Sequence, residues 1–243
     1  MTLTWIFIRP IVLAVLVVAT QSSSPVVPDE KGRWGYPRTS SLEPVEHVLM
    51  GHRFRIPKAY LYLKKQWAPR IPEPGNPLLM EGSLPGIAPY SKETAPLHKD
   101  YRSGYRQIVH FSLRGIKYGI GLDEEYFEPR YLEECRGKRL DFRVCRATFN
   151  DDEILVQIDG EKKIAFKCSK DGTVPSPHCE GWFPLIDNVA FEIRFSKPHL
   201  GRAGLIIAGV YEVICGFHVP DANIPLTYNY CEKKVYHGTE SKD

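Results

Sequence analysis

Alternating polar and apolar positions mark most of the extended segments that the sequence predicts. Residues 53–63 alternate charged and apolar side chains in the way that a half-buried strand does. Pro57 has no N–H to donate to a strand ladder, so it either confines this strand to a sheet edge or splits it in two. The same alternation predicts further strands over 107–113, 117–122, 142–149, 153–158, 163–168 and 189–195.

Two short turn sequences are expected to join these segments into hairpins. Arg114-Gly115 separates one pair of predicted strands, and Asp159-Gly160 leads between another pair with a dipeptide that two-residue hairpins prefer. Residues 107–168 are therefore predicted to form an antiparallel meander. A charged stretch over 123–139 lies between its halves and favours a short helix.

A different periodicity appears near the C-terminus, where apolar residues recur every three or four positions, as on one side of an amphipathic helix. They are Leu200, Ala203, Ile207, Val210, Ile214 and Phe217. Pro198 suits the beginning of a helix, whereas several glycines weaken it and Ile206-Ile207 would suit a strand equally well. We favour the helix, and Glu212 argues against a membrane span. The predicted fold class is α+β: a mostly antiparallel β-sheet with one principal C-terminal helix, stapled by disulfides.

Proline dominates the segment that precedes the meander. Seven prolines fall between residues 64 and 100, too many for a helix or a central strand. We therefore expect a long proline-rich loop over 64–106. A loop of this length inside a compact domain is often functional, and a cover over a sheet face is the alternative.

The N-terminal segment predicts export. Residues 1–19 read as a signal peptide, because their last nine residues are all apolar and Val17 and Ala19 place small side chains for cleavage after Ala19. An uncleaved membrane anchor is the alternative. Serine, proline and charge without apolar periodicity predict a linker over 20–46. Residues 47–243 then form a single α+β domain, which a composition of 43% apolar residues can support.

All six cysteines lie in the C-terminal half of the chain. An even number of cysteines in an exported protein predicts a disulfide framework, because the extracytoplasmic space is oxidising. The short sequence gaps favour three local bridges, namely Cys135 to Cys145, Cys168 to Cys179, and Cys215 to Cys231. We accordingly expect a periplasmic or otherwise extracytoplasmic protein, with anchoring in the inner membrane left open. Buried free thiols would be the alternative in a cytosolic protein.

Charge is informative locally rather than overall. A formal net charge of +3 is too small to favour nucleic acid as a partner. Opposite charges nevertheless gather in two neighbouring runs, and such patches suit a protein partner because complementary charge steers encounter. The acidic run is Asp123, Glu124, Glu125 and Glu128, and the basic run is Arg136, Lys138, Arg139, Arg143 and Arg146. A surface laced by internal salt bridges is the alternative.

The sequence carries none of the common catalytic motifs. It has no Gly-x-Ser-x-Gly nucleophile elbow, no His-Glu-x-x-His metal helix and no glycine-rich phosphate loop. The histidines are scattered, and the nearest two, His47 and His52, have the wrong spacing for one face of a helix. We therefore predict a protein that is not an enzyme and that holds no metal and no cofactor.

A family resemblance adds a function to this picture. The segment Phe54-Arg55-Ile56-Pro57-Lys58-Ala59-Tyr60-Leu61 after an export signal resembles the Ile-Pro-Lys-x-Tyr-Leu opening of small bacterial periplasmic proteins. Immunity proteins against type VI secretion lipase effectors are among them. The cysteine-led segment from Cys179 to Phe195, followed by the helical pattern from Leu200 to Phe217, is also similar to these proteins. The tryptophan usual in that helix is absent, and Gly204 stands near its place.

The resemblance implies a binding protein that neutralises a secreted antibacterial effector in the periplasm by occluding it. The expected partner is thus a toxin or effector protein, with no nucleic acid and with a membrane only through an uncleaved N-terminal segment. The proline-rich loop is one candidate contact, and the two charged runs are another. An envelope enzyme with an unrecognised site, or a structural or ligand-binding envelope protein, is the alternative.

Overall fold

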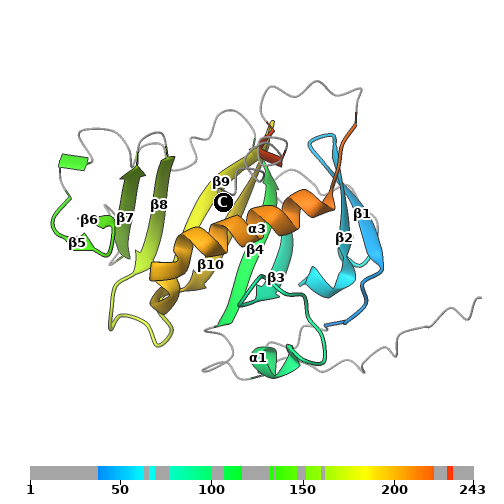
Figure 1. Ribbon diagram of the computed structural model, residues 1–243, viewed down its shortest axis with the longest axis horizontal. Coiled ribbons are helices and arrows are strands. Elements are labelled where there is room, and N and C mark those ends of the chain that lie inside the picture. The colour runs from blue at the N-terminus through cyan, green and yellow to red at the C-terminus, as the bar shows by residue number, and fades with distance from the viewer. Residues whose placement is uncertain are drawn as a thin grey trace, which may run out of the picture.

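Two antiparallel sheets and one long helix make up the described chain (Figure 1). The computed structural model describes residues 38–62, 66–68, 77–99, 107–116, 132–133, 135–146, 152–159, 162–221 and 229–231. The predicted signal peptide, most of the predicted linker and the whole acidic run lie outside the described residues. The predictions made for them stay predictions.

The larger sheet has eight strands in the order β3-β4-β10-β9-β8-β7-β6-β5. Their bounds are β3 Leu78–Ser83, β4 Ile108–Gly115, β5 Lys138–Arg139, β6 Phe142–Arg146, β7 Asp152–Asp159, β8 Lys162–Ser169, β9 His178–Ile186 and β10 Val189–Ser196. Strands β5 to β10 pair in chain order as a meander, and β4 and β3 extend the sheet beyond β10. A mostly antiparallel sheet is therefore confirmed.

The smaller sheet has three strands, ordered β1-β2-β11, and lies beyond the β3 end of the large sheet in Figure 1. Its bounds are β1 Pro44–Leu49, β2 His52–Pro57 and β11 His218–Val219. Gly51 has φ +88° in the turn between β1 and β2, a conformation that favours glycine. Pro57 ends β2, and a 3₁₀ turn, Lys58–Tyr60, follows it. Pro57 thus ends the predicted strand 53–63 early, and a turn follows it rather than the second strand that a split would give.

One helix covers the middle of the large sheet (Figure 1). It begins with the 3₁₀ segment η5, Lys197–Arg202, and continues as α3, Ala203–Phe217. All six residues of the predicted apolar stripe are buried, which confirms the helix. Tyr211 stands edge-on to Phe191 of β10, with ring centroids 4.5 Å apart. Length and composition alone would let Lys197–Phe217 cross a membrane, but its apolar side is packed in the protein core.

Three disulfides staple the described chain, in the pairs that the sequence spacing favours. Cys168 and Cys179 lie opposite one another on β8 and β9. Cys135 joins Cys145 of β6, and Cys215 of α3 joins Cys231 near the C-terminus. Each closes a loop of 10, 11 or 16 residues, and loops of this size stabilise a fold by about 2–4 kcal/mol.

One of the two predicted hairpins is wrong and the other is confirmed. Arg114 and Gly115 lie inside β4 rather than in a turn, because β4 continues past them along β10. Since β4 pairs with β10 and β3, the meander begins at β5 and not at residue 107. Asp159 pairs with Lys162, so β7 and β8 do form the expected hairpin.

The proline-rich segment is more regular than expected. Residues 64–106 contain the edge strand β3 and a short helix α1, Ala95–Lys99. Pro77 and Pro85 flank β3 without interrupting it, and Pro96 occupies the first turn of α1, where no N–H is needed. Two smaller boundaries also differ: β1 begins at Pro44, inside the predicted linker, and Lys138–Arg139 of the predicted helix 123–139 form β5.

Candidate functional site

The basic run of the sequence folds into one hairpin at the end of the large sheet. Lys138 of β5 pairs with Arg143 of β6, and the next pair inward leaves Leu140 and Asp141 as a two-residue turn. Paired residues point to the same side of a sheet, so the two cationic side chains are neighbours. The hairpin thus concentrates basic charge, as the spacing in the sequence suggested.

A disulfide fixes the segment that precedes this hairpin. Cys135 is bonded to Cys145 in β6. The N–H of Arg136 donates to the carbonyl of Val144 at 2.8 Å, and the N–H of Val144 donates to the carbonyl of Gly137 at 3.3 Å. The segment 135–146 is therefore a covalently closed frame whose basic side chains start from fixed backbone positions.

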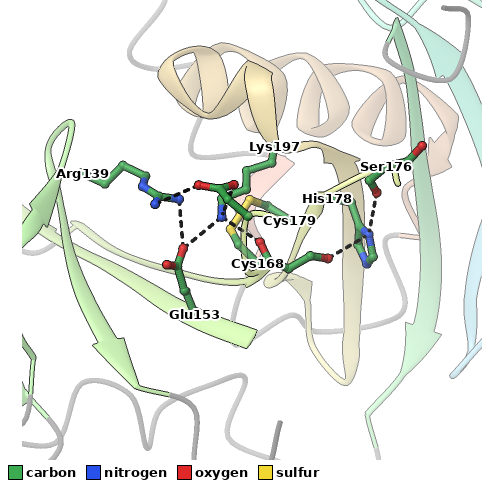
Figure 2. The surroundings of a disulfide bond; sticks show 9 residues. Arg139, Glu153, Cys168, Ser176, His178, Cys179 and Lys197 are labelled. Carbon is green, nitrogen blue, oxygen red and sulfur yellow. Dashed lines mark hydrogen bonds and ion pairs between the residues drawn. A yellow bond between two sulfur atoms is a disulfide. The ribbon is translucent and has the colours of Figure 1, made fainter. Parts of the chain in front are cut away.

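Arg139 does not face outward with the other basic residues, because it belongs to an ion-pair network beside the Cys168–Cys179 disulfide (Figure 2). Its guanidinium lies 2.9 Å from Glu153 Oε2 and 3.1 Å from Asp171 Oδ2. Lys197 Nζ lies 2.9 Å from each of the same two carboxylates and donates to the carbonyl of Ser169 at 2.7 Å. We call these four side chains and this carbonyl the Lys197 network.

Every N–H group of the Lys197 ammonium has an acceptor within the Lys197 network. The side chain of Lys197 is only 6% exposed, and burying an unpaired ammonium would be costly. An ammonium has three N–H groups, and Glu153, Asp171 and the Ser169 carbonyl provide an acceptor for each. The hydrogen bond from Lys197 also lowers the pKa of Asp171. Arg139 therefore has a structural role, which is the alternative that the sequence left open for this residue.

Three other basic residues of the hairpin remain exposed. Arg136, Lys138 and Arg143 lie on the surface, and none of them forms an ion pair with any other residue that the structure describes. Like charges directly opposite one another in a sheet cost roughly 0.2–1 kcal/mol, and Lys138 faces Arg143 in this way. The charge that the sequence predicted as a candidate surface is therefore exposed at these three positions, and no described carboxylate neutralises it.

Leu140 adds an apolar group at the tip of the hairpin. Its side chain is 61% exposed, and its φ of +54° is a conformation that costs a branched residue about 1 kcal/mol. Glycine is the usual residue at a left-handed first position of a two-residue turn. Leu140 leans toward η5, because a Cβ at Gly201 would lie 3.6 Å from its Cδ1. We call Arg136, Lys138, Leu140 and Arg143 the hairpin patch.

The other predicted contact residues are Arg146 and the acidic run. Arg146 lies in β6 opposite Glu153. Asp123, Glu124, Glu125 and Glu128 lie outside the described residues, so their expected place beside the basic run stays a prediction.

A buried polar cluster around Glu81 is a feature that the sequence did not reveal. Glu81 lies in β3, is 2% exposed, and accepts hydrogen bonds from Arg38 Nε at 2.5 Å and Arg38 Nη2 at 3.3 Å. His98 Nδ1 of α1 lies 3.2 Å from Glu81 Oε1, and His110 of β4 stands opposite Glu81 in the sheet. The ring of Tyr90 packs edge-on against His98, with centroids 5.1 Å apart. We call this the Glu81 cluster.

The Glu81 cluster is closed to solvent. Burial alone would raise the pKa of Glu81, but hydrogen bonds from His98 and Arg38 and their charges outweigh it and lower the pKa to about 2. A general acid or base has to reach its substrate, whereas Glu81 and His98 are each 2% exposed. The cluster therefore acts as a clamp that ties Arg38 and α1 to the edge of the large sheet.

The members of this cluster are far apart in the sequence, which explains why no motif indicated it. Arg38 and Glu81 are 43 residues apart. One signal was present, because Glu81 interrupts an otherwise apolar and small stretch, Leu78 to Ser83, where a charge must find a partner.

The described residues were also compared with the arrangement that a metal site requires. No group of three or more histidine, cysteine, aspartate or glutamate side chains there is arranged to hold a metal ion.

Comparison with known proteins yields a likeness in structure and none in sequence. No protein-family model and no curated protein matches the chain. A solved structure, an immunity protein of the Stenotrophomonas maltophilia type IV secretion system, superimposes with a TM-score of 0.54 and 14% sequence identity. The match covers 82% of this chain and 100% of that protein. At this identity the likeness shows a shared fold.

Proposed function

We propose that this chain is an immunity protein that neutralises an antibacterial effector by binding to it. The observation that carries the proposal is the shared fold over the whole length of an immunity protein from a bacterial secretion system. The resemblance of the segment Phe54–Leu61 to periplasmic immunity proteins supports the same class from the sequence, independently of the fold.

The site of action that we propose is the periplasm. Three disulfides need an oxidising compartment to form and persist. The apolar N-terminal segment supports export to it, and an effector that attacks the cell envelope would be met there.

Occlusion is the mechanism that the described residues support. The central charges of the two clusters, Lys197 and Glu81, are 6% and 2% exposed and are paired inside the protein. The hairpin patch is exposed, has no ion-pair partner among the described residues, and is held on a segment that a disulfide closes. A rigid surface of this kind binds without a large ordering cost, which suits stoichiometric inhibition.

The delivery system of the effector is a separate question. The sequence resemblance implied type VI lipase effectors, whereas the solved neighbour belongs to a type IV system. The fold likeness therefore supports the broader class of secretion-system immunity proteins, and gives no support to a lipase effector in particular.

A growth assay tests the proposal. The product of the adjacent gene is expressed with an export signal in a sensitive strain, together with this chain either exported or retained in the cytoplasm. We expect the exported chain to restore growth and the retained chain to fail. A toxic gene product whose toxicity is unaffected by the exported chain, with no complex on co-purification, contradicts the proposed function.

A further inference from the structure

We infer that the hairpin patch is the contact surface for an acidic face of the partner protein, with Leu140 inserted as an apolar anchor. This inference rests on the proposed function and assigns the residues that perform it.

The first argument is positive charge that has no ion-pair partner among the residues that the structure describes. The two nearby basic side chains Arg139 and Lys197 are neutralised, because they share two carboxylates. Arg136, Lys138 and Arg143 have no such carboxylate in the described part of the chain, and two of them repel one another across the ladder. An acidic surface would relieve that repulsion on binding.

The second argument is the conformation of Leu140. Its φ of +54° and its exposure both disfavour leucine, because a glycine or a polar residue would relieve the backbone and avoid exposing an apolar side chain. Nothing in the packing of the described residues requires an apolar group at the tip. An exposed apolar side chain on the same hairpin as exposed arginine and lysine has the composition of an interface centre with its polar rim.

The third argument is rigidity. The Cys135–Cys145 disulfide and the hydrogen bonds between Arg136, Gly137 and Val144 fix the backbone from which the patch projects. Little backbone freedom is lost when such a surface binds. Arginine also favours carboxylates because its planar fork can bind both oxygens, so aspartate and glutamate side chains are the groups expected on the partner.

A protein partner fits these observations better than a nucleic acid. The chain as a whole carries only +3, and the patch contains an exposed leucine that a phosphate backbone would not use. A surface that binds polyanions in general would be expected to spread its positive charge over a wider area.

Charge reversal with a matched control tests the assignment. The test variant carries Arg136→Glu, Lys138→Glu and Arg143→Glu, and the control carries Arg53→Glu, Lys92→Glu and Lys170→Glu. Each variant replaces three basic residues by glutamate, so both change the net charge equally. All six side chains are exposed, so neither variant disturbs the core. Binding to the purified product of the adjacent gene is measured by titration calorimetry, and protection by the growth assay.

We expect the test variant to bind about 100-fold more weakly and to lose protection, and the control to remain within about threefold of the wild type. Wild-type affinity in the test variant overturns the inference and leaves the proposed function standing. An equal loss in both variants also overturns it, because long-range attraction would then be sufficient. A wild-type chain that neither binds nor protects contradicts the proposed function and, with it, this assignment. Tight binding to duplex DNA of mixed sequence that the test variant abolishes would assign the patch to nucleic acid and overturn the inference.

Leu140→Gly separates binding from folding. Glycine relieves the positive φ, so the variant should unfold at the same temperature as the wild type or higher. We expect it to bind about tenfold more weakly because the apolar anchor is gone. A variant that is stabilised and binds with unchanged affinity contradicts the role of Leu140.

Discussion

At the scale of single residues, some charged side chains are buried and paired, and others are exposed. Glu81 and Lys197 are 2% and 6% exposed, and each has partners drawn from distant segments. The exposed residues Arg136, Lys138 and Arg143 are close in sequence, so the basic run could be predicted from the sequence alone. The buried clusters were invisible, because a carboxylate and its guanidinium 43 residues apart leave no local pattern.

Replacing Glu81 tests the buried clamp. Glu81→Gln leaves the Arg38 guanidinium buried without its counter-charge, and we expect the free energy of unfolding to fall by about 3–5 kcal/mol in urea at pH 7. Glu43→Gln removes the partner of Lys58 in an exposed pair, where Glu43 is 67% exposed, and should change it by less than about 1 kcal/mol. Equal effects of the two substitutions would show that the Glu81 cluster is not a clamp.

The ion pair between Arg38 and Glu81 predicts how the stability of the protein changes at acidic pH. Because the pKa of Glu81 in the folded protein is lowered to about 2 from its ordinary 4.5, its stabilising contribution is complete above about pH 4.5 and is lost as the pH falls toward 2. The wild type should therefore lose stability over this range more steeply than Glu81→Gln does. Parallel urea-unfolding profiles between pH 5 and pH 2.5 would contradict the ionised state of Glu81.

At the scale of elements, α3 is the one that organises the core. Its stripe of Leu200, Ala203, Ile207, Val210, Ile214 and Phe217 lies against the sheet, while Leu205 on the outer side is 76% exposed. The helix and the strands β6 to β8 and β10 were predictable, because each carries an uninterrupted periodicity.

A pair of substitutions on α3 tests its packing. Ile214 is fully buried, so Ile214→Ala should lower the free energy of unfolding by about 2–5 kcal/mol through lost contacts and the cavity that it leaves. Leu205→Ala on the exposed side should change it by about 0.5 kcal/mol or less. The reverse order in chemical denaturation would mean that the outer side of α3 is the buried one.

Two features of the large sheet could not be predicted from the sequence, each for an identifiable reason. Strand β3 was hidden because prolines on both sides of it gave the whole segment the composition of a loop, although none lies within Leu78–Ser83. Arg114-Gly115 looked like a turn, yet β4 continues through both residues because they pair with Ala190 and Val189 of β10. Long-range packing decided both cases.

At the scale of the whole molecule, three disulfides fit an oxidising, extracytoplasmic compartment. The three bridges all lie in the half of the chain that contains the hairpin patch and α3. The fold is shared with an immunity protein at 14% sequence identity. The candidate patch was predictable as a charged run, but its separation into the exposed trio and the paired Arg139 required the structure.

Thiol accessibility and mass test the maturation of the chain. Protein recovered from the periplasm should show no alkylated cysteine without reduction and six after reduction in denaturant, and its mass should lack residues 1–19. Six alkylated thiols without reduction would contradict the disulfide framework. A mass that retains residues 1–19 would indicate an anchor in place of a cleaved signal.

The central claim is neutralisation by stoichiometric contact, and titration of the purified effector with this protein tests it most directly. We expect loss of the effector's toxic activity to be complete at one molecule of this protein per effector, with a dissociation constant below about 1 μM. Activity that persists at a large excess of this protein, or that disappears at a small fraction of one equivalent, would contradict inhibition by occlusion.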